Sequence, residues 1–409
     1  MNTEIIIDDI SRASEIIKNG GLVAVPTETV YGLAGNGLNS ETVAEIYEVK
    51  GRPEVKPLSL MVPDASAMDS YCRCVPRQAR YLAERFWPGP LTIVLKADEI
   101  VPKIVRAGGE TVGLRCPDHP LTLALLRECG LPLAAPSANP SGEPSPKTAQ
   151  QVTAYFSGRI EAVIDGGECG LGHESTIIDM SQTPYRILRQ GALPEDEIDA
   201  SLIDGMTIFG ISGGTGCGKT TALEILEDMG ALVIDCDAVY HRLLDENDSM
   251  LSEIANAFSS AMSDGRLDRK KLGAIVFADP EKLEVLNAIT HRYVDAEVTR
   301  LLRDYARAGG ELAAIDAIAL IESGLSKKCD AVVGVTAEYE KRIARLIARE
   351  GITDEYAAAR IAAQKPDKYF EQNCDYIIEN NSTLEDFKKT CTALFEKILG
   401  GKEHGGKHI

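Results

Sequence analysis

An eight-residue stretch near the middle of the chain, GGTGCGKT at 213–220, constrains the fold more than any other. It fits the phosphate-binding pattern G-x-x-x-x-G-K-[ST], with Gly213, Gly218, Lys219 and Thr220 in the fixed places. Such a loop lies between a strand and a helix, and an apolar run at 206–211 directly precedes it. The sequence therefore predicts a nucleotide-binding α/β domain that begins near residue 205.

The chemistry of this loop assigns roles to its residues. Glycines let backbone N–H groups surround phosphates, and the N-terminus of the following helix favours negative charge. Lys219 is expected to reach the β- and γ-phosphates, and the Thr220 hydroxyl to hold Mg²⁺. The predicted ATP-binding residues of this domain are Gly213, Gly214, Thr215, Gly216, Cys217, Gly218, Lys219, Thr220 and Thr221.

The 409-residue length leaves some 200 residues before the loop, enough for a separate domain. The net charge of −19 argues against a broad nucleic-acid-binding surface. Ten scattered cysteines without a C-x-x-C pair favour reduced thiols, and no leader or membrane span is apparent. We therefore expect a cytoplasmic protein that does not contact membranes.

Short apolar runs alternate with helical periodicity, which favours an α/β architecture. An acidic segment at 190–204 marks the boundary, with a short linker of limited freedom near 198–205. We predict domains at 1–200 and 205–400 and a disordered tail at 401–409. Strands are expected at 22–26, 91–95, 112–114, 133–135, 162–164, 206–211, 232–234, 313–315, 331–335 and 376–378, and helices at 42–50, 339–349 and 354–364.

A series of short motifs follows the phosphate loop in a fixed order. They are LVIDCDA at 232–238, GRLDR at 265–269, IVF at 275–277, LNAITH at 286–291, RIAAQ at 360–364 and CDYIIEN at 374–380. This series resembles the dephospho-CoA kinases over roughly 206–399. The resemblance implies a P-loop kinase domain with a parallel sheet and a helical lid, which transfers phosphate from ATP to the ribose 3′-hydroxyl of dephospho-CoA.

The resemblance also implies roles for single residues. Asp237 matches the general base of the family, and an acid after the second strand would face the phosphate loop. Asp235 is structural or linked to Mg²⁺, and the two acids could instead be a capping pair. Arg345 and Arg349, four residues apart, match lid arginines that offset phosphoryl charge, the alternative being a solvated basic face. His291 either contacts the acceptor or packs in a helical subdomain.

Two positions depart from the pattern of this family. The stretch IDAIALIE at 315–322 lacks the usual proline, and alanines at Ala317 and Ala319 interrupt its leucines. Arg292 follows His291 where the family has proline. Both departures concern the acceptor pocket, so they affect the expected substrate rather than the expected fold.

The N-terminal half contains cations at predicted loop and strand ends. Lys50, Arg52, Arg115 and Arg189 lie among hydroxyl-rich turns. Arginine forks bind phosphate and carboxylate in a bidentate manner, and Ser and Thr hydroxyls complete such a shell. These residues therefore indicate an oxyanion or nucleotide site, unless they are separate surface cations and helix caps.

The motifs around these cations are shared with a known family. They are PTETVYGL at 26–33, KGRP at 50–53, FWPGPLT at 86–92, VGLRCP at 112–117, APSAN at 135–139, DGG at 165–167, EST at 174–176 and RQG at 189–191. They resemble the YrdC/TsaC-like threonylcarbamoyl-AMP synthases over about 5–195. The resemblance implies a twisted open α/β sheet and a reaction of L-threonine, bicarbonate and ATP that gives threonylcarbamoyl-AMP and pyrophosphate. The product would pass to tRNA-modifying enzymes.

In this family the catalytic cations match Lys50 and Arg52, and Mg²⁺ assists the reaction. The threonine-binding positions match Thr29, Arg115 and Ser175. The ATP-binding positions match Arg52, Lys56, Thr111, Ser137, Asn139, Ser145 and Arg189. Lys56, Met61 and Gln190 stand where many members have asparagine, histidine and proline.

We therefore predict a bifunctional enzyme with two ATP sites. One alternative is that one half has lost catalysis and serves as a nucleotide sensor or an RNA-binding module. Another is that the C-terminal half phosphorylates a different small acceptor, such as a nucleoside, although the Asp-Cys-Asp and Leu-Asp-Arg motifs argue against it.

Overall fold

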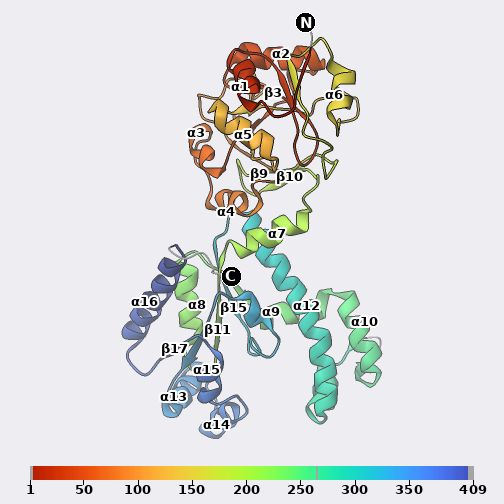
Figure 1. Cartoon of the computed structure of the whole chain (residues 1–409). Coiled ribbons are helices and arrows are strands. Elements are labelled where there is room, and N and C mark those ends of the chain that lie inside the picture. The colour runs from red at the N-terminus through yellow and green to blue at the C-terminus, as the bar shows by residue number, and fades with distance from the viewer. Residues whose placement is uncertain (1–2, 264–265, 404–409) are drawn as a thin grey trace. The chain divides into compact units, whose positions relative to one another are not determined.

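The computed structural model describes residues 3–263 and 266–403 and divides into two compact units (Figure 1). The N-terminal unit runs to Gly205 and includes the short segment Arg307–Gly309, and the C-terminal unit holds the rest from Met206 onward. In the described part of the chain, no helix is both long enough and apolar enough to cross a membrane.

The described residues of the N-terminal unit form a mixed ten-stranded sheet flanked by helices (Figure 1). The strand order is β1-β8-β2-β3-β7-β4-β6-β5-β9-β10, with parallel and antiparallel pairs. The strands are β1 (Glu4–Ile6), β2 (Val23–Val25), β3 (Gly32–Asn36), β4 (Ser59–Met61), β5 (Leu91–Lys96), β6 (Thr111–Arg115), β7 (Leu133–Ala134), β8 (Ala162–Ile164), β9 (Thr176–Asp179) and β10 (Arg186–Arg189). The helices are α1 (Ile10–Lys18), α2 (Ser40–Lys50), α3 (Met68–Tyr71), α4 (Arg77–Phe86), α5 (Pro120–Cys129), α6 (Ala149–Phe156) and α7 (Glu195–Asp204).

Capping residues fix both ends of α2, the helix that ends at Lys50. The Asn39 side chain accepts hydrogen bonds from the backbone N–H groups of Glu41 and Thr42. At the other end Gly51 takes a left-handed conformation (φ 59°), which an L side chain rarely adopts. The chain turns there, so Lys50 ends the helix and Arg52 begins the next loop.

The acidic segment before the boundary is helical, so the prediction of a short linker at 198–205 was wrong. In α7 the first turn consists of Glu195, Asp196 and Glu197, whose charges stabilise a helix N-terminus. Ile198 and Leu202, four residues apart, are fully or almost fully buried. Acidity suggested a linker, but this apolar spacing defines an amphipathic helix.

The described residues of the C-terminal unit form a parallel five-stranded sheet and a small antiparallel pair. The main order is β12-β15-β11-β16-β17. The strands are β11 (Thr207–Gly213), β12 (Leu232–Asp235), β13 (Met262–Ser263), β14 (Arg266–Leu267), β15 (Leu312–Asp316), β16 (Ala331–Thr336) and β17 (Tyr376–Glu379). The helices are α8 (Lys219–Asp228), α9 (Cys236–Glu246), α10 (Asp248–Ala257), α11 (Arg269–Phe277), α12 (Pro280–Arg307), α13 (Tyr339–Glu350), α14 (Asp354–Ala362), α15 (Asp367–Asn373) and α16 (Leu384–Glu403).

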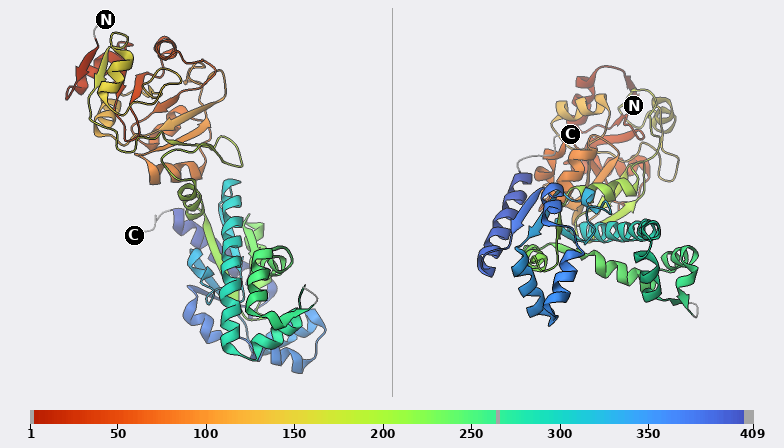
Figure 2. Two further views of the ribbon diagram at one scale, coloured as in Figure 1. Left: turned by 90° about the vertical axis from the view of Figure 1, so that its right-hand side faces the viewer. Right: turned by 90° about the horizontal axis from the view of Figure 1, so that it is seen from below.

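The sequence-based expectation of two α/β domains, the second with a parallel sheet, is confirmed. The strand at 162–164 agrees with β8 at both ends. The long helix α12, which the sequence did not predict, lies beside α10 (Figure 2). Tyr293 of α12 donates a 2.7 Å hydrogen bond to Glu253 of α10, and Arg292 forms an ion pair with the same carboxylate.

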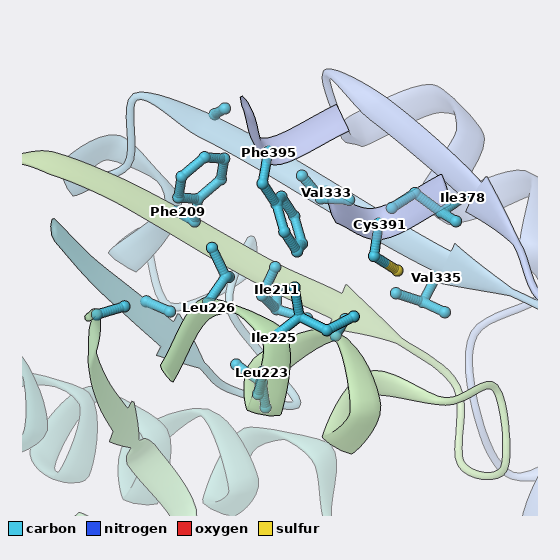
Figure 3. Close-up of a cluster of buried hydrophobic side chains, with 14 of the residues drawn as sticks. Phe209, Ile211, Leu223, Ile225, Leu226, Val333, Val335, Ile378, Cys391 and Phe395 are labelled. Atoms are coloured by element: carbon cyan, nitrogen blue, oxygen red, sulfur yellow. The ribbon is translucent and has the colours of Figure 1, made fainter. Parts of the chain in front are cut away.

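The core of the C-terminal unit lies between the sheet and the helices α8 and α16 (Figure 3). Phe209 of β11 and Phe395 of α16 are fully buried and meet edge to face, with ring centroids 5.2 Å apart. The same cluster includes Leu223 and Leu226 of α8, so it holds β11 and α8 together, and the phosphate loop is the connection between those two elements.

Helix α16 continues to Glu403, three residues into the segment predicted as a disordered tail. Gly400 and Gly401 are therefore helical, although glycine disfavours helices. The remainder of that predicted tail, 404–409, lies outside the described residues.

Candidate functional sites

In the N-terminal unit a cavity of about 270 Å³ opens over the centre of the sheet. It lies where β4, β5, β6 and β9 meet the loop after β7. Six of the predicted site residues line it: Arg52, Thr111, Arg115, Ser137, Ser175 and Arg189. Met61 also lines it. Residues from widely separated motifs are thus brought to one place.

Polar neighbours hold the residues that were predicted to bind threonine in position. Arg115, only 7% exposed, donates from Nη2 to Glu28 (2.8 Å) and to the Thr29 hydroxyl (2.7 Å), while its Nε has no protein partner. Thr29 thus lies behind Arg115 and does not line the cavity. The Ser175 hydroxyl forms a 2.8 Å hydrogen bond with Thr92. The arginine is oriented by its neighbours and retains an unused donor.

Lys50 lies beneath the Ser-x-Asn loop and does not line the cavity. Its side chain is 3% exposed and donates to the backbone carbonyls of Ser137 and Asn139. Burial, with a smaller effect from Arg52, lowers the pKa of Lys50 to about 7. The Asn139 side chain donates to Pro140 and Glu143 carbonyls at 3.0 and 2.6 Å. Both residues therefore shape the loop that presents Ser137.

The remaining predicted residues lie at the edge of the site. The Ser145 hydroxyl donates to Glu174 at 2.8 Å, and this bond lowers the pKa of the Glu174 carboxyl. Lys56 is exposed, and its backbone carbonyl accepts a 3.3 Å hydrogen bond from Arg52. Neither Ser145 nor Lys56 lines the cavity.

The cavity suits anions. Among the described residues that line it are Arg52, Arg115 and Arg189 against one carboxylate, Glu174. Burial lowers the pKa of both Arg52 and Arg189, and in Arg189 the other two arginines add to this effect. Gathering like charges in a partly buried space is unfavourable unless an anion offsets it. The arrangement therefore favours a polyanionic ligand.

Sequence reasoning quoted Glu28, Thr92 and Glu174 within motifs but gave them no role. Thr92 lies on β5 and Ser175 directly precedes β9, and these strands pair in parallel. The contact spans 83 residues of sequence, so only the strand pairing reveals it. Glu28, between two threonines, was the more visible signal, because a carboxylate beside a cation-rich site commonly orients an arginine.

In the C-terminal unit the phosphate loop forms as predicted between β11 and α8. Gly213 (φ 141°) and Gly218 (φ 112°) have conformations that favour glycine. A Cβ atom at Gly213 would lie 2.3 Å from the Val335 carbonyl oxygen, so a larger residue would displace the loop. The cavity above the loop, about 380 Å³, is lined by Gly214, Thr215, Gly216, Gly218, Lys219, Thr220, Thr221, Asp316, Arg345 and Arg349.

Of the predicted ATP-binding residues, Gly213 and Cys217 do not line this cavity. Cys217 is fully buried in the core beneath the loop, where burial raises the pKa of its thiol. Lys219 donates from Nζ to the Gly213 carbonyl at 2.9 Å, which holds the lysine across the loop. The predicted lid arginines, Arg345 and Arg349, line the cavity from α13.

Three carboxylates gather at the carboxyl edge of the sheet. Asp235 and Asp316 are register partners on β12 and β15. Asp235 caps α9 by accepting hydrogen bonds from the N–H groups of Asp237 and Ala238, which is the structural role considered for it. Partial desolvation raises the pKa of Asp237 and of Asp316; Asp235 adds to both effects and Lys219 opposes them.

A second, larger cavity of about 530 Å³ adjoins Asp237. Helices α9, α11 and α12 and the segment 317–325 form its walls, which include Leu244, Leu272, Val276, Phe277, Leu286, Val294 and Ile318. His291 lines it, so this histidine faces a cavity, and burial lowers the pKa of its imidazole. Ala317 and Ala319, the positions that depart from the family pattern, also line it.

Three residues of this unit were missed as site candidates. Arg269 is the one Lys or Arg among the described residues that line the larger cavity. Asp316 lines the phosphate cavity, and Arg342 binds the phosphate loop from α13. Arg269 and Asp316 lie within motifs named in the sequence analysis. Arg342 had no recognisable signal besides the basic character of its helix.

The buried Lys50 predicts a pH-dependent stability. Its pKa of about 7 is below the ~10.4 of an unfolded chain, so between these values the unfolded state binds more protons. Stability therefore rises with pH across this window, by at most about 1.4 kcal/mol per pH unit. Lys50→Met should lose this dependence.

Urea unfolding followed by fluorescence of Trp87, the chain's one tryptophan, reports on the same unit. Lys96→Met, at an exposed position on β5, is the matched control. Equal pH slopes for wild type and Lys50→Met would contradict a neutral Lys50.

The two halves of the chain are similar to two different groups of known proteins. Residues 15–191 match the Sua5/YciO/YrdC family model, described as "Telomere recombination", and residues 207–386 match the model "Dephospho-CoA kinase". The N-terminal half is 46% identical over 190 residues to a threonylcarbamoyl-AMP synthase of Pyrococcus abyssi (46% of this chain, 56% of the relative). A synthase of Bacillus subtilis is 46% identical over 193 residues (47% and 56%).

The chain thus spans just over half the length of these synthases. A dephospho-CoA kinase of Corynebacterium glutamicum is 36% identical over 196 residues, which make up 47% of this chain and 98% of that kinase. Both resemblances seen in the sequence are confirmed. Through its C-terminal half the chain belongs to the dephospho-CoA kinase family, and its N-terminal half carries a Sua5/YciO/YrdC domain.

Proposed function

We propose that this chain is a bifunctional enzyme with one ATP-dependent reaction in each half. The N-terminal half condenses L-threonine, bicarbonate and ATP to threonylcarbamoyl-AMP and pyrophosphate, for use by tRNA-modifying enzymes. The C-terminal half phosphorylates the ribose 3′-hydroxyl of dephospho-CoA. For the N-terminal half, the observation that carries the proposal is the cavity in which three arginines face one carboxylate.

In the N-terminal reaction bicarbonate takes up a proton and loses water to give CO₂, and the threonine amine adds to this CO₂ and releases a proton to form a carbamate. A carbamate oxygen then attacks the α-phosphorus of ATP, the bond to the β-phosphate oxygen breaks, and pyrophosphate leaves. Arg115, oriented by Glu28, would bind the threonine carboxylate with its guanidinium, which lines the cavity. Arg52 and Arg189 would offset the charge that develops on the phosphates.

The Arg115 assignment predicts a selective loss of threonine affinity. A charge-assisted hydrogen bond contributes about 1.5–3 kcal/mol, so Arg115→Met should raise the KM for threonine by roughly 10- to 100-fold, with little change in the KM for ATP. Threonine-dependent pyrophosphate release measures both constants.

Arg80→Met, which removes an exposed ion pair with Asp69, is the control. A change confined to the KM for ATP would contradict the assignment of Arg115. Pyrophosphate release by the wild type that does not depend on threonine would contradict the proposed reaction.

In the C-terminal half, the observation that carries the proposal is the position of Asp237. It lines the apolar cavity, while the charge of Lys219 from the phosphate loop acts on its carboxyl. Asp237 would orient the acceptor hydroxyl and take its proton as the oxygen attacks the γ-phosphorus of ATP. The bond from the γ-phosphorus to the bridging oxygen breaks, and ADP leaves. Lys219, Arg345 and Arg349 would offset the charge on the transferring group.

The donor set beside the loop fits Mg²⁺. The Thr220 hydroxyl and the Asp316 carboxylate line the phosphate cavity, and oxygen donors are what this ion prefers. Among the described residues no group of three or more His, Cys, Asp or Glu could hold a metal ion, so nucleotide oxygens would complete the shell. When bound, Mg²⁺ would neutralise phosphate charge.

The larger cavity favours an extended acceptor over a nucleoside. Its apolar walls suit a heterocyclic base or an alkyl amide arm, and Arg269 supplies a positive charge. Arg269 forms an ion pair with Asp245, eight residues beyond Asp237 on α9. At 1.5 Å per residue this is a rise of ~12 Å. Dephospho-CoA carries its diphosphate at the 5′-oxygen of the ribose, so one molecule could reach both residues.

Asp237→Asn tests the role of the general base. We expect kcat for dephospho-CoA phosphorylation to fall by roughly 10²- to 10⁴-fold, as is typical for loss of general base catalysis, with a small change in KM. The control is Asp235→Asn, because asparagine also caps helices and should preserve most of kcat. Turnover by Asp237→Asn near the wild-type rate would contradict the assignment.

Arg269→Ala tests the acceptor class. Loss of its charge should raise the KM for dephospho-CoA about tenfold, which corresponds to the ~1.4 kcal/mol expected of a weak charge-assisted contact. The KM for adenosine, which lacks the diphosphate, should not change. Arg266→Ala, at an exposed neighbouring position, is the control. Equal effects of Arg269→Ala on both acceptors would show that Arg269 does not bind the diphosphate.

A further inference from the structure

A buried arginine of α13, Arg342, reaches the phosphate loop without lining the phosphate cavity. Its side chain is 5% exposed and donates from Nε to the Thr215 carbonyl at 3.0 Å. It also contacts Gln364 (Nη2 to Oε1, 3.2 Å) and Asp367 (Nη1 to Oδ1, 3.4 Å). The guanidinium therefore joins the loop to the connection after α14 and to the first residue of α15.

Gln364 holds the same loop residue from its other side, through the preceding peptide group. Its Oε1 accepts a 2.7 Å hydrogen bond from the Thr215 N–H, while Arg342 binds the Thr215 carbonyl. The orientation of this loop residue is thus fixed at both its donor and its acceptor. Rotation of either peptide group next to the Thr215 Cα would break one of these partly buried hydrogen bonds, and a buried polar group left unpaired is costly.

The neighbouring loop carbonyls are held in the same way. Arg345 donates to the Gly216 carbonyl at 3.3 Å, and Asn380 donates to the Cys217 carbonyl at 2.8 Å. Carbonyl oxygens aimed at phosphate would repel it, whereas N–H groups attract it. Side chains that bind these carbonyls therefore keep the repulsive ends of the peptides away from the ligand.

The loop sequence leaves room for the arginine. A Cβ atom at Gly214 would lie 2.3 Å from Arg342 Nη2, and one at Gly216 would lie 3.0 Å from the Arg342 backbone oxygen. The absence of a side chain at these two glycines thus allows α13 to pack closely, in addition to leaving space for phosphates. The close contact indicates that the phosphate loop and Arg342 pack as one rigid structure.

We propose that Arg342 is a positioning residue that holds the phosphate loop in its nucleotide-binding form and couples it to α13 and to the connection between α14 and α15. Arg342 acts through the Thr215 carbonyl group and does not touch the nucleotide. The proposal deepens the proposed kinase function and rests on it for its kinetic test.

The kinetic test separates positioning from folding. Arg342→Met should raise the KM for ATP at least tenfold in dephospho-CoA phosphorylation, with the KM for dephospho-CoA within twofold of wild type. Arg342→Lys, which can still reach the Thr215 carbonyl, should restore part of this loss. Arg360→Met, an arginine of α14 paired with Glu350 instead of the loop, should behave as wild type.

A second measurement needs no substrate. Hydrogen exchange of the segment 213–220 in the full chain should be at least tenfold faster in Arg342→Met and in Gln364→Met than in wild type or Arg360→Met. Gln364→Glu keeps the acceptor and should retain slow exchange. The double variant should exchange no faster than either single variant, because Arg342 and Gln364 also bind each other and act as one hydrogen-bond network.

Two results would overturn the proposal. One is unchanged exchange of the loop in Arg342→Met. The other is a lower melting temperature of that variant with a KM for ATP within twofold of wild type. Failure of the wild type to phosphorylate dephospho-CoA would contradict the proposed kinase function, and the exchange experiment would still decide the role of Arg342.

Discussion

Backbone carbonyl oxygens hold cations at both sites of this chain, and the rest of each site depends on that arrangement. Lys50 binds the carbonyls of Ser137 and Asn139, and Arg189 binds that of Ser175 at 2.8 Å. In the C-terminal half Arg342 binds the loop carbonyl of Thr215 at 3.0 Å. A carbonyl fixes the direction of a cation without neutralising it, so the charge of Arg189, which lines its cavity, remains available to phosphate. Lys50 and Arg342 do not line the cavities, and they fix the loops that do.

This constraint explains why the sites need few carboxylates. In the synthase-like cavity Glu174 is the one carboxylate among the described lining residues, and Glu28 orients Arg115 from behind. In the kinase-like half Asp316 is the one carboxylate among the described residues that line the phosphate cavity, and Asp237 lines the larger cavity beside it. Positive charge is thus concentrated where phosphates would bind, although the chain as a whole has a net charge of −19. Each half contains its own cavities, and neither proposed product is a substrate of the other half.

Local patterns predicted much of the fold. The phosphate loop, the strand β8 and the helix α13 follow from glycine spacing, a short apolar run and helical periodicity. Contacts between residues far apart in the sequence could not be predicted from local patterns. Thr92 and Ser175 form a hydrogen bond only because β5 and β9 are neighbours in the sheet. The segment of α7 was predicted as a linker because of its acidic residues, whereas the spacing of Ile198 and Leu202, which are buried, indicates a helix. Arg342 was missed because its loop contact spans 127 residues of sequence.

The most direct test of two independent activities is a product assay on the intact chain by mass spectrometry. The protein would receive ATP, Mg²⁺, bicarbonate, L-threonine and dephospho-CoA, with each acceptor omitted in turn. The account predicts threonylcarbamoyl-AMP and pyrophosphate only when threonine is present, and CoA and ADP only when dephospho-CoA is present. Loss of either product in the complete mixture would contradict the bifunctional account.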